Sequence, residues 1–357
     1  MIHGNFLCFS SLMVSILFWF LCSSVTQVRM TDPEALKVRA DVVVAKDGTG
    51  QFTTVTEAVA SAPENIKKRY VIYVKKGVYE EIVNIGKRKD NITIVGDGRD
   101  LTILTGSLSG NHTSHTATLV PCDATTGVDG NGFTAQDIGI QNTAGAEKGQ
   151  AVALRISGDR SVVYRCRVEA FQDTLYAHSG RQFYRECYIT GTVDFICGEA
   201  AAVFQQCQIE ARKPMKGQSN MITAQSRSYK TQNSGFTIYK CNITATPDLT
   251  PVKGTVKTFL GRPWGPYSTV VVMKSFIDDL IDPAGWAPWD IKDKGRLSTL
   301  FYGEFQNYGP GANTTNRVKW KGYKSIKDPK EAATFTLKNL IGVSWLRFRD
   351  VPYEDGL

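Results

Sequence analysis

The stretch Gln172–Gly198, which opens with QDTLY and closes with DFICG, decides the fold of this chain. Its two acids, Asp173 and Asp194, are 21 residues apart. A cysteine precedes each acid by seven residues, at Cys166 and Cys187, so that acids and cysteines share one period. A repeat of this length is typical of a solenoid, in which each repeat is one coil and equivalent positions stack.

Stacking would bring the two acids together. If parallel strand pairing joins the coils, equivalent positions lie roughly 4.8 Å apart, and Asp173 and Asp194 become neighbouring carboxylates. The alternative is two unrelated surface aspartates, the usual place of that residue. The matching cysteine period argues against that alternative.

The segments around the cysteines predict a parallel β-helix. Four segments end in Cys-x-Val or Cys-x-Ile, and each is expected to be one strand: Val162–Val168, Phe183–Ile189, Val203–Ile209 and Phe236–Ile243. An earlier coil is expected at Phe133–Ile140, with Asp137 at the cysteine position. Short β-branched strands at a spacing of about 20–34 residues favour a β-helix over a sandwich. Helical signals between the strands are too weak for a doubly wound sheet.

Outside the repeats, local patterns predict five elements. Strands are expected at Asp41–Ala45, Tyr70–Val74 and Asn91–Gly96. A short helix is expected at Thr54–Ala62, with a threonine cap and a proline after its end, and another at Pro329–Ala333.

The first 26 residues read as a signal peptide for secretion. Phe6–Leu21 is almost wholly apolar, and small residues follow it. The rest contains no Pro/Ser-rich linker, which predicts a single domain, and no later segment is apolar enough to contact a membrane after the signal is removed. Export is consistent with four N-glycosylation sequons, at Asn91, Asn111, Asn242 and Asn313.

The cysteines and the charge add two expectations about the exported protein. Six of the eight cysteines remain after removal of the signal, and an oxidising compartment favours at least one disulfide. Stacking allows Cys166–Cys187, Cys187–Cys207 or Cys207–Cys241, with buried free thiols for the remainder. The formal net charge of +8 favours a polyanionic partner, which for a secreted protein means an acidic polysaccharide rather than nucleic acid.

Several separated motifs resemble those of plant pectin methylesterases, the pectinesterase family. They lie in order along residues 41–353: GVYEE at Gly77–Glu81, QAVALR at Gln150–Arg155, QDTLY at Gln172–Tyr176, DFICG at Asp194–Gly198, LGRPW at Leu260–Trp264, GWAPW at Gly285–Trp289 and YGEF at Tyr302–Phe305. The resemblance implies a single-stranded right-handed parallel β-helix. It implies hydrolysis of the C6 methyl esters of pectin in the plant cell wall, with release of methanol and without a metal or another cofactor. It also implies two partners, methyl-esterified homogalacturonan and a proteinaceous pectinesterase inhibitor.

The resemblance assigns roles residue by residue. Asp194 matches the nucleophile, and Asp173 matches the general acid and base. The remaining matches are Gln150 and Gln172 for the oxyanion, Arg262, Trp264 and Thr113 for the substrate site, and Cys187 with Cys207 for the usual disulfide.

The chain departs from the family pattern in three places. Cys197 stands beside the nucleophile where phenylalanine is usual, and the stretch Leu119–Asn131, close after Thr113, is longer than the pattern. The inhibitor-like domain that precedes the catalytic domain in many plant members is not expected here. The first departure bears most directly on activity, although a small apolar thiol can fill part of an aromatic site.

The residue types suit ester hydrolysis. Two carboxyl groups about 5 Å apart repel each other when both are charged, so the pKa of one rises and that acid keeps its proton while the other stays ionised. An arginine that binds one carboxylate through two hydrogen bonds decides which acid is ionised. Neutral amides such as Gln150 can stabilise an oxyanion, and Trp264, Trp286 and Trp289 offer faces on which a sugar can stack.

Two other functions remain open. One is a retaining glycosidase acting on pectin, because its two carboxylates are also about 5 Å apart. The other is a catalytically impaired wall protein that binds pectin.

Overall fold

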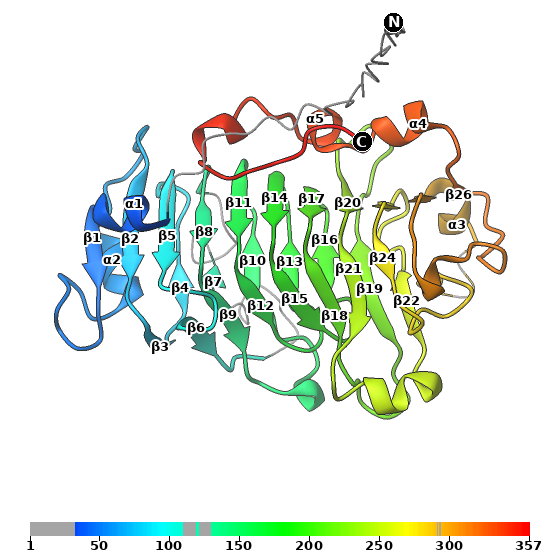
Figure 1. The fold of residues 1–357 in the computed structure, drawn as a ribbon, viewed down its shortest axis with the longest axis horizontal. Coiled ribbons are helices and arrows are strands. Elements are labelled where there is room, and N and C mark those ends of the chain that lie inside the picture. The colour runs from blue at the N-terminus through cyan, green and yellow to red at the C-terminus, as the bar shows by residue number, and fades with distance from the viewer. Residues whose placement is uncertain (1–32, 110–118, 121–129, 291, 293) are drawn as a thin grey trace, which may run out of the picture.

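The chain folds into a right-handed parallel β-helix. The computed structural model describes residues 33–109, 119–120, 130–290, 292 and 294–357. The expected signal peptide, Thr113, Asn111, Cys122 and most of the longer stretch lie outside these residues. Three parallel sheets, named A, B and C here, run along the long axis of the molecule (Figure 1), and each full coil adds one strand to each sheet in turn.

The strands of the three sheets are short. Sheet A contains β1 (Val42–Val44), β2 (Tyr70–Val74), β5 (Ile92–Gly96), β8 (Thr134–Gln136), β11 (Ser161–Tyr164), β14 (Arg181–Arg185), β17 (Ala201–Gln205), β20 (Gly235–Tyr239), β23 (Thr269–Met273), β25 (Phe301–Phe305) and β26 (Tyr323–Ser325). Sheet B contains β3 (Gly77–Glu80), β6 (Thr102–Gly106), β9 (Gly139–Asn142), β12 (Arg167–Glu169), β15 (Tyr188–Gly191), β18 (Gln208–Ala211), β21 (Asn242–Ala245) and β24 (Phe276–Ile277). Sheet C contains β4 (Val83–Asn84), β7 (Leu119–Val120), β10 (Leu154–Ile156), β13 (Leu175–Ala177), β16 (Ile196–Gly198), β19 (Asn220–Gln225) and β22 (Thr258–Gly261).

Helices occur only as short segments among the described residues. They are α1 (Pro33–Val38), α2 (Val55–Ser61), α3 (Arg296–Thr299), α4 (Pro329–Ala333) and α5 (Leu337–Leu340), with the 3₁₀ turns η2 (Ala146–Lys148), η3 (Thr250–Thr255), η4 (Pro310–Ala312) and η5 (Leu346–Phe348). None of these helices in the described part of the chain has the length and hydropathy needed to cross a bilayer.

The elements predicted outside the repeats are confirmed, with boundaries within one residue. β2 and α4 coincide with the predicted ranges, and β1 and β5 are slightly shorter. Helix α2 begins after Thr54, whose side chain caps it by accepting a hydrogen bond from the Glu57 amide. Its buried face, which includes Val55 and Val59, packs into the main core.

The four segments that end in Cys-x-Val or Cys-x-Ile are not single strands. Each is split by a residue with positive φ, which turns the chain from sheet A into sheet B: Arg165, Glu186, Gln206 and Lys240. A corner is needed because a strand that stayed straight could not wrap around the core. Asp137 occupies this corner position as well, with φ of 54°. The residue in register with Cys166 is therefore Ile138, one residue later than predicted, because Gly139 pairs with Arg167.

The cysteines stack as predicted, but the structure contradicts the expected Cys187–Cys207 disulfide. All five cysteines in the described residues are buried free thiols. Cys187 and Cys207 each follow a corner residue and donate to the carbonyl oxygen two residues earlier, at 3.3 Å and 3.6 Å. Ser275 makes the same contact in the next coil but one, with its hydroxyl 3.0 Å from the Met273 oxygen. The position thus favours a small side chain that can donate a weak hydrogen bond inside the coil.

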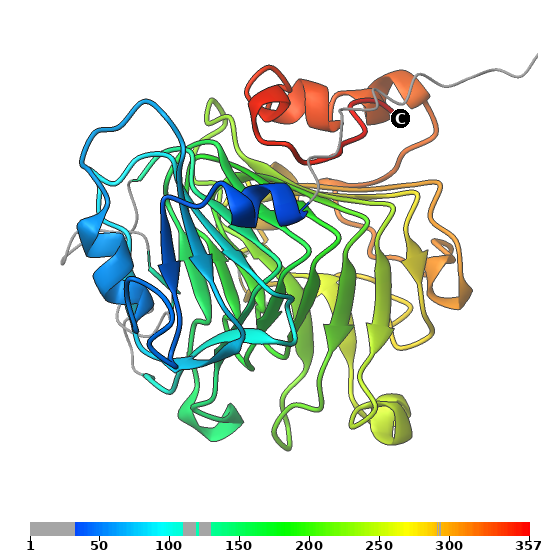
Figure 2. The same cartoon turned by 60° about the vertical axis from the view of Figure 1, so that its left-hand side comes forward.

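The C-terminal segment covers the outer face of sheet A. In Figures 1 and 2 the segment that contains α5, coloured red, lies over this side of the β-helix. Leu337, Leu346 and Tyr353 are buried there against Phe183 and Val203 of sheet A. The C-terminal segment is therefore a layer packed on sheet A through these buried side chains.

Candidate active site

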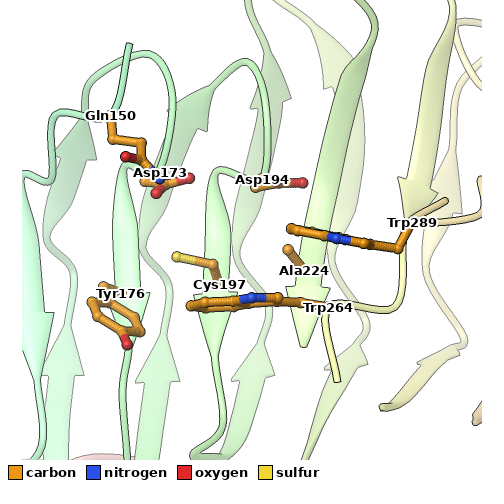
Figure 3. A pocket seen from close by; sticks show the side chains of 8 residues that line it. All are labelled: Gln150, Asp173, Tyr176, Asp194, Cys197, Ala224, Trp264 and Trp289. Atoms are coloured by element: carbon orange, nitrogen blue, oxygen red, sulfur yellow. The ribbon is translucent and has the colours of Figure 1, made fainter. Parts of the chain in front are cut away.

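Asp173 and Asp194 lie side by side where the chain turns from sheet B into sheet C. Asp173 precedes β13, and Asp194 precedes β16, the next strand of the sheet. The Asp173 amide donates to the carbonyl oxygen of Val193 at 3.0 Å, which joins the two turns directly. Both aspartates have left-handed backbone angles, with φ of 61° and 53°. Aspartate tolerates this conformation better than most residues, and here it directs both side chains into one cavity (Figure 3).

Arg262 fixes the orientation of Asp194. Its guanidinium donates two hydrogen bonds to the carboxylate, from Nε at 2.8 Å and from Nη2 at 2.6 Å. The guanidinium carbon also lies 4.3 Å from the centre of the Trp289 ring. A planar bidentate pair of this kind fixes both the position of a carboxylate and its ionised form.

Asp173 is the acid that holds a proton. Burial raises its pKa to about 8, and the charge of Asp194 acts in the same direction. Arg262 and a hydrogen bond from the Gln150 side chain oppose this rise. At neutral pH the Asp173 carboxyl is therefore mostly protonated and can donate to an oxygen atom in the cavity.

Asp194 differs because of its ion pair. Burial raises its pKa above the ordinary value of 3.8, while the hydrogen bonds and the charge of Arg262 lower it. Asp173 has no such bidentate partner, so Asp194 ionises first. Two carboxylates whose environments separate their pKa values are the usual arrangement for an acid and a nucleophile.

The two acids line a cavity of 280 Å³. Its other walls are Gln150, Tyr176, Cys197, Ala224, Trp264 and Trp289 (Figure 3). The rings of Trp264 and Trp289 stack with centroids 6.2 Å apart, and Trp264 is 37% exposed. A large aromatic surface at the rim of a polar cavity suits a sugar ring, which has apolar C–H faces.

Cys197 forms part of the cavity floor between neighbouring strands of sheet C. It pairs in register with Tyr176 on one side and with Ala224 on the other. Burial raises the pKa of its thiol well above the ordinary value, and the charges of Asp173 and Asp194 raise it further. The thiol therefore stays protonated.

The structure brings together most of the residues that the sequence singles out. Asp173, Asp194, Gln150, Arg262 and Trp264 meet at this site. Gln172 pairs through its backbone with Gln150, but its side chain does not line the cavity. Trp286 is a core residue, 1% exposed, whose indole nitrogen donates to Glu304.

Two lining residues, Tyr176 and Ala224, are not predicted from the sequence. Tyr176 could have been found, because it follows Asp173 by three residues, as Cys197 follows Asp194. No sequence pattern points to Ala224, because the next coil is longer and breaks the 21-residue period.

Comparisons with known proteins agree with this geometry. The Pectinesterase family model matches residues 41–344. A probable pectinesterase/pectinesterase inhibitor of Arabidopsis thaliana is 60% identical over 325 residues, which are 91% of this chain and 60% of that protein. Pectinesterase 2.1 of Solanum lycopersicum is 55% identical over 92% of this chain and 59% of its own length.

Solved structures give the same result. The pectin methylesterase from carrot superposes with a TM-score of 0.85 at 52% identity, over 89% of this chain and 98% of that chain. The chain spans about three fifths of the length of the curated relatives above. From the family match, the relatives and the shared β-helix, we conclude that the chain belongs to the pectinesterase family.

Proposed function

We propose that this protein hydrolyses the methyl esters of pectin and releases methanol. The observation that carries the proposal is the pair of neighbouring buried aspartates, of which one is held by Arg262 and the other has a pKa of about 8. Such a pair supplies an ionised nucleophile and a proton donor in the same cavity.

In the first half of the reaction, an ionised Asp194 oxygen attacks the ester carbonyl carbon and forms a tetrahedral intermediate. The side-chain amide of Gln150, at the cavity wall, stabilises the negative oxygen. Gln172, whose backbone pairs with Gln150, becomes a second donor when its side chain turns into the cavity. The C–O bond to the methoxy group then breaks, and Asp173 gives its proton to that oxygen. Methanol leaves, and the acyl group remains on Asp194 as an anhydride.

In the second half, water attacks the acyl carbon of the anhydride and loses a proton to the Asp173 carboxylate. The bond between the acyl carbon and the Asp194 oxygen breaks. Asp194 is regenerated as a carboxylate, Asp173 regains its proton, and the product is a galacturonic acid unit. Arg262 holds Asp194 in place throughout, so one orientation serves both attack and departure.

The proposed substrate is methyl-esterified homogalacturonan in the plant cell wall. The net charge of +8 and the exposed Trp264 suit an acidic sugar polymer. Secretion is supported by the exposed asparagines of two sequons, Asn242 and Asn313, whereas the amide nitrogen of Asn91 is engaged by the Ile66 carbonyl. A proteinaceous inhibitor remains a predicted partner.

Methanol release from highly methyl-esterified pectin tests the proposal. The wild-type protein should release methanol and lower the pH without creating new reducing ends. Asp194→Asn should abolish turnover at every pH, because an amide cannot act as the nucleophile. New reducing ends would indicate a glycosidase instead, and pectin binding without methanol release would indicate an inactive binding protein.

A further inference from the structure

The short helix α3 holds a loop at the rim of the active-site cavity. It begins with Arg296, which is half-buried. One nitrogen of its guanidinium, Nη1, donates to two successive backbone oxygens, that of Pro263 at 3.1 Å and that of Trp264 at 2.6 Å. The hydroxyl of Thr299, at the other end of α3, donates to the Pro266 oxygen. The helix thus binds three carbonyl groups of one loop, and the mechanism proposed above does not use it.

This loop, residues 262–266, is called the rim loop here, and regular strand pairing stops at its start. The following coil supports β22 as far as Gly261, whose oxygen accepts from the Ala287 amide at 3.0 Å. Pro263 has no amide hydrogen, so it cannot continue the ladder. Backbone oxygens beyond this point need another donor, and Arg296 supplies it.

Trp264 is the member of the rim loop that faces the cavity (Figure 3). Its ring centroid lies 6.2 Å from that of Trp289 and 6.2 Å from that of Tyr176. More than a third of the residue is exposed, so packing alone does not fix the ring. The backbone of Trp264 is held on two sides, because its amide donates to the Gln225 oxygen at 3.1 Å and its oxygen accepts from Arg296.

Arg262, at the start of the rim loop, has anchors of its own. Its guanidinium is bound to Asp194, and its amide donates to the Thr223 oxygen at 3.0 Å. These contacts do not pass through α3. Loss of the Arg296 hydrogen bonds should therefore loosen Trp264 more than it disturbs the pair of Arg262 and Asp194.

We propose that Arg296 is a positioning residue for substrate binding, which holds Trp264 in the orientation that accepts a sugar ring at the cavity rim. This inference rests on the proposed function for the identity of the sugar. A ring that is already in place binds the substrate more tightly, because less conformational freedom is lost on binding.

The test is Arg296→Met, which keeps a long side chain and removes its donors. On a fully methyl-esterified oligogalacturonate, KM should rise about three- to tenfold while kcat stays within about twofold, as expected for an interaction that serves ground state and transition state alike. Arg296→Lys should keep KM within about twofold of the wild type, because one ammonium group can donate to both oxygens as Nη1 does.

Lys89→Met is the matched control. Lys89 is also half-buried, and its amine likewise donates to two backbone oxygens, those of Ala60 and Ala62, in an earlier coil. This control should leave KM and kcat unchanged. An equal rise of KM in Lys89→Met and Arg296→Met would overturn the proposal.

The choice of substrate separates positioning from charge. A fully methyl-esterified oligomer has no carboxylate for the Arg296 charge to attract. If KM on this oligomer is unchanged in Arg296→Met and only the binding of de-esterified oligomers weakens, Arg296 acts through its charge and the proposal is wrong.

A double-mutant cycle tests whether the effect passes through Trp264. In a Trp264→Ala background, Arg296→Met should raise KM by less than about 1.5-fold, because the ring that it positions is already absent. The same rise of KM in both backgrounds would contradict the proposal.

Hydrogen exchange gives a readout that needs no substrate. The amides of Trp264 and Gly265, which both donate to the Gln225 oxygen, should exchange at least about fivefold faster in Arg296→Met. Amides of sheet A should keep their wild-type rates, which shows that the variant is folded. Unchanged exchange of Trp264 and Gly265 would overturn the proposal. An absence of methanol release from the wild type would refute the proposed function, and the exchange rates would still decide whether Arg296 holds the rim loop.

Discussion

At the scale of single residues, the division of labour between two chemically identical side chains depends on their contacts. Asp194 receives two hydrogen bonds from Arg262, and Asp173 receives one from Gln150. Both are buried, so water stabilises either anion less than it would at the surface. The difference in hydrogen-bonded partners is what separates their roles.

Replacing Asp173 by asparagine should lower activity and change the pH dependence of stability. Activity should fall about 10²–10⁴-fold, because the group that we propose as the acid for methanol and the base for water is lost. The pKa of Asp173 is about 8 in the folded protein against an ordinary 3.8, so between these values the folded state binds more protons than the unfolded state. The free energy of unfolding of the wild type therefore falls as the pH rises through that window.

Asp173→Asn removes this titration. At pH 9 the variant should be more stable than the wild type by on the order of 1–3 kcal/mol, with a much smaller difference at pH 5. Urea denaturation at both pH values measures the effect, with Asp290→Asn, at an exposed turn, as the control. A difference that does not depend on pH would show that Asp173 is not held protonated.

At the scale of elements, β16 carries both Cys197 of the cavity floor and a glycine that no other residue can replace. Gly198 has φ of 117°, and a Cβ added there would lie 2.0 Å from the Ala177 carbonyl oxygen of β13. The conflict is with backbone in a neighbouring strand, so rotation of a side chain cannot relieve it. This close approach belongs to the same two strands that follow Asp173 and Asp194.

Gly198→Ala should therefore be strongly destabilising. We expect a loss of more than about 3 kcal/mol in the free energy of unfolding, together with reduced methanol release, because β16 must move away from β13. Gly48→Ala is the matched control, since Gly48 also has positive φ, 77°, but has no atom within 4 Å of the added Cβ. The control should lose only about 1 kcal/mol, the cost of the backbone conformation alone. Equal losses in the two variants would contradict the steric explanation.

At the scale of the whole molecule, the C-terminal segment forms a second hydrophobic cluster with the outer face of sheet A. Leu346 in η5 is fully buried against sheet A, whereas Phe348 in the same turn is 79% exposed. Glu354 joins the segment to sheet A through hydrogen bonds from Gln205 and Gln206. Sheet A of a β-helix would otherwise expose an apolar outer face, which is unfavourable in water.

Leu346→Ala should thus weaken the entire β-helix. The expected loss is about 2–4 kcal/mol in the free energy of unfolding, from the lost burial and the cavity left behind. Phe348→Ala should stay within about 0.5 kcal/mol of the wild type. Thermal unfolding followed by circular dichroism measures both variants. A separate early transition in Leu346→Ala, with the main transition unchanged, would show that the segment is an independent unit.

The sequence by itself determined the repeating features of the fold. Asp173 and Asp194 are 21 residues apart, as are Cys166 and Cys187, and this shared interval was enough to predict stacked coils and paired carboxylates. Residues one coil apart become neighbours when the coils are joined by parallel strand pairing. Short elements with local signals, such as the Thr54 cap of α2, were equally readable. The four strands expected to be continuous were in fact broken, since the corners at residues such as Glu186 have no distinctive residue type.

Tertiary structure decided what depends on residues far apart in the chain. Arg262 reaches Asp194 from 68 residues away, and only the closed coils bring it to one acid and not to the other. Closure likewise brought the Cys187 and Cys207 thiols within reach of carbonyl oxygens inside the coil, and placed Leu346 on sheet A. Periodicity determines which positions are neighbours in adjacent coils. The contacts that shift a pKa or fill a hydrophobic core come from side chains in more distant coils, and no local sequence pattern predicts where those side chains lie.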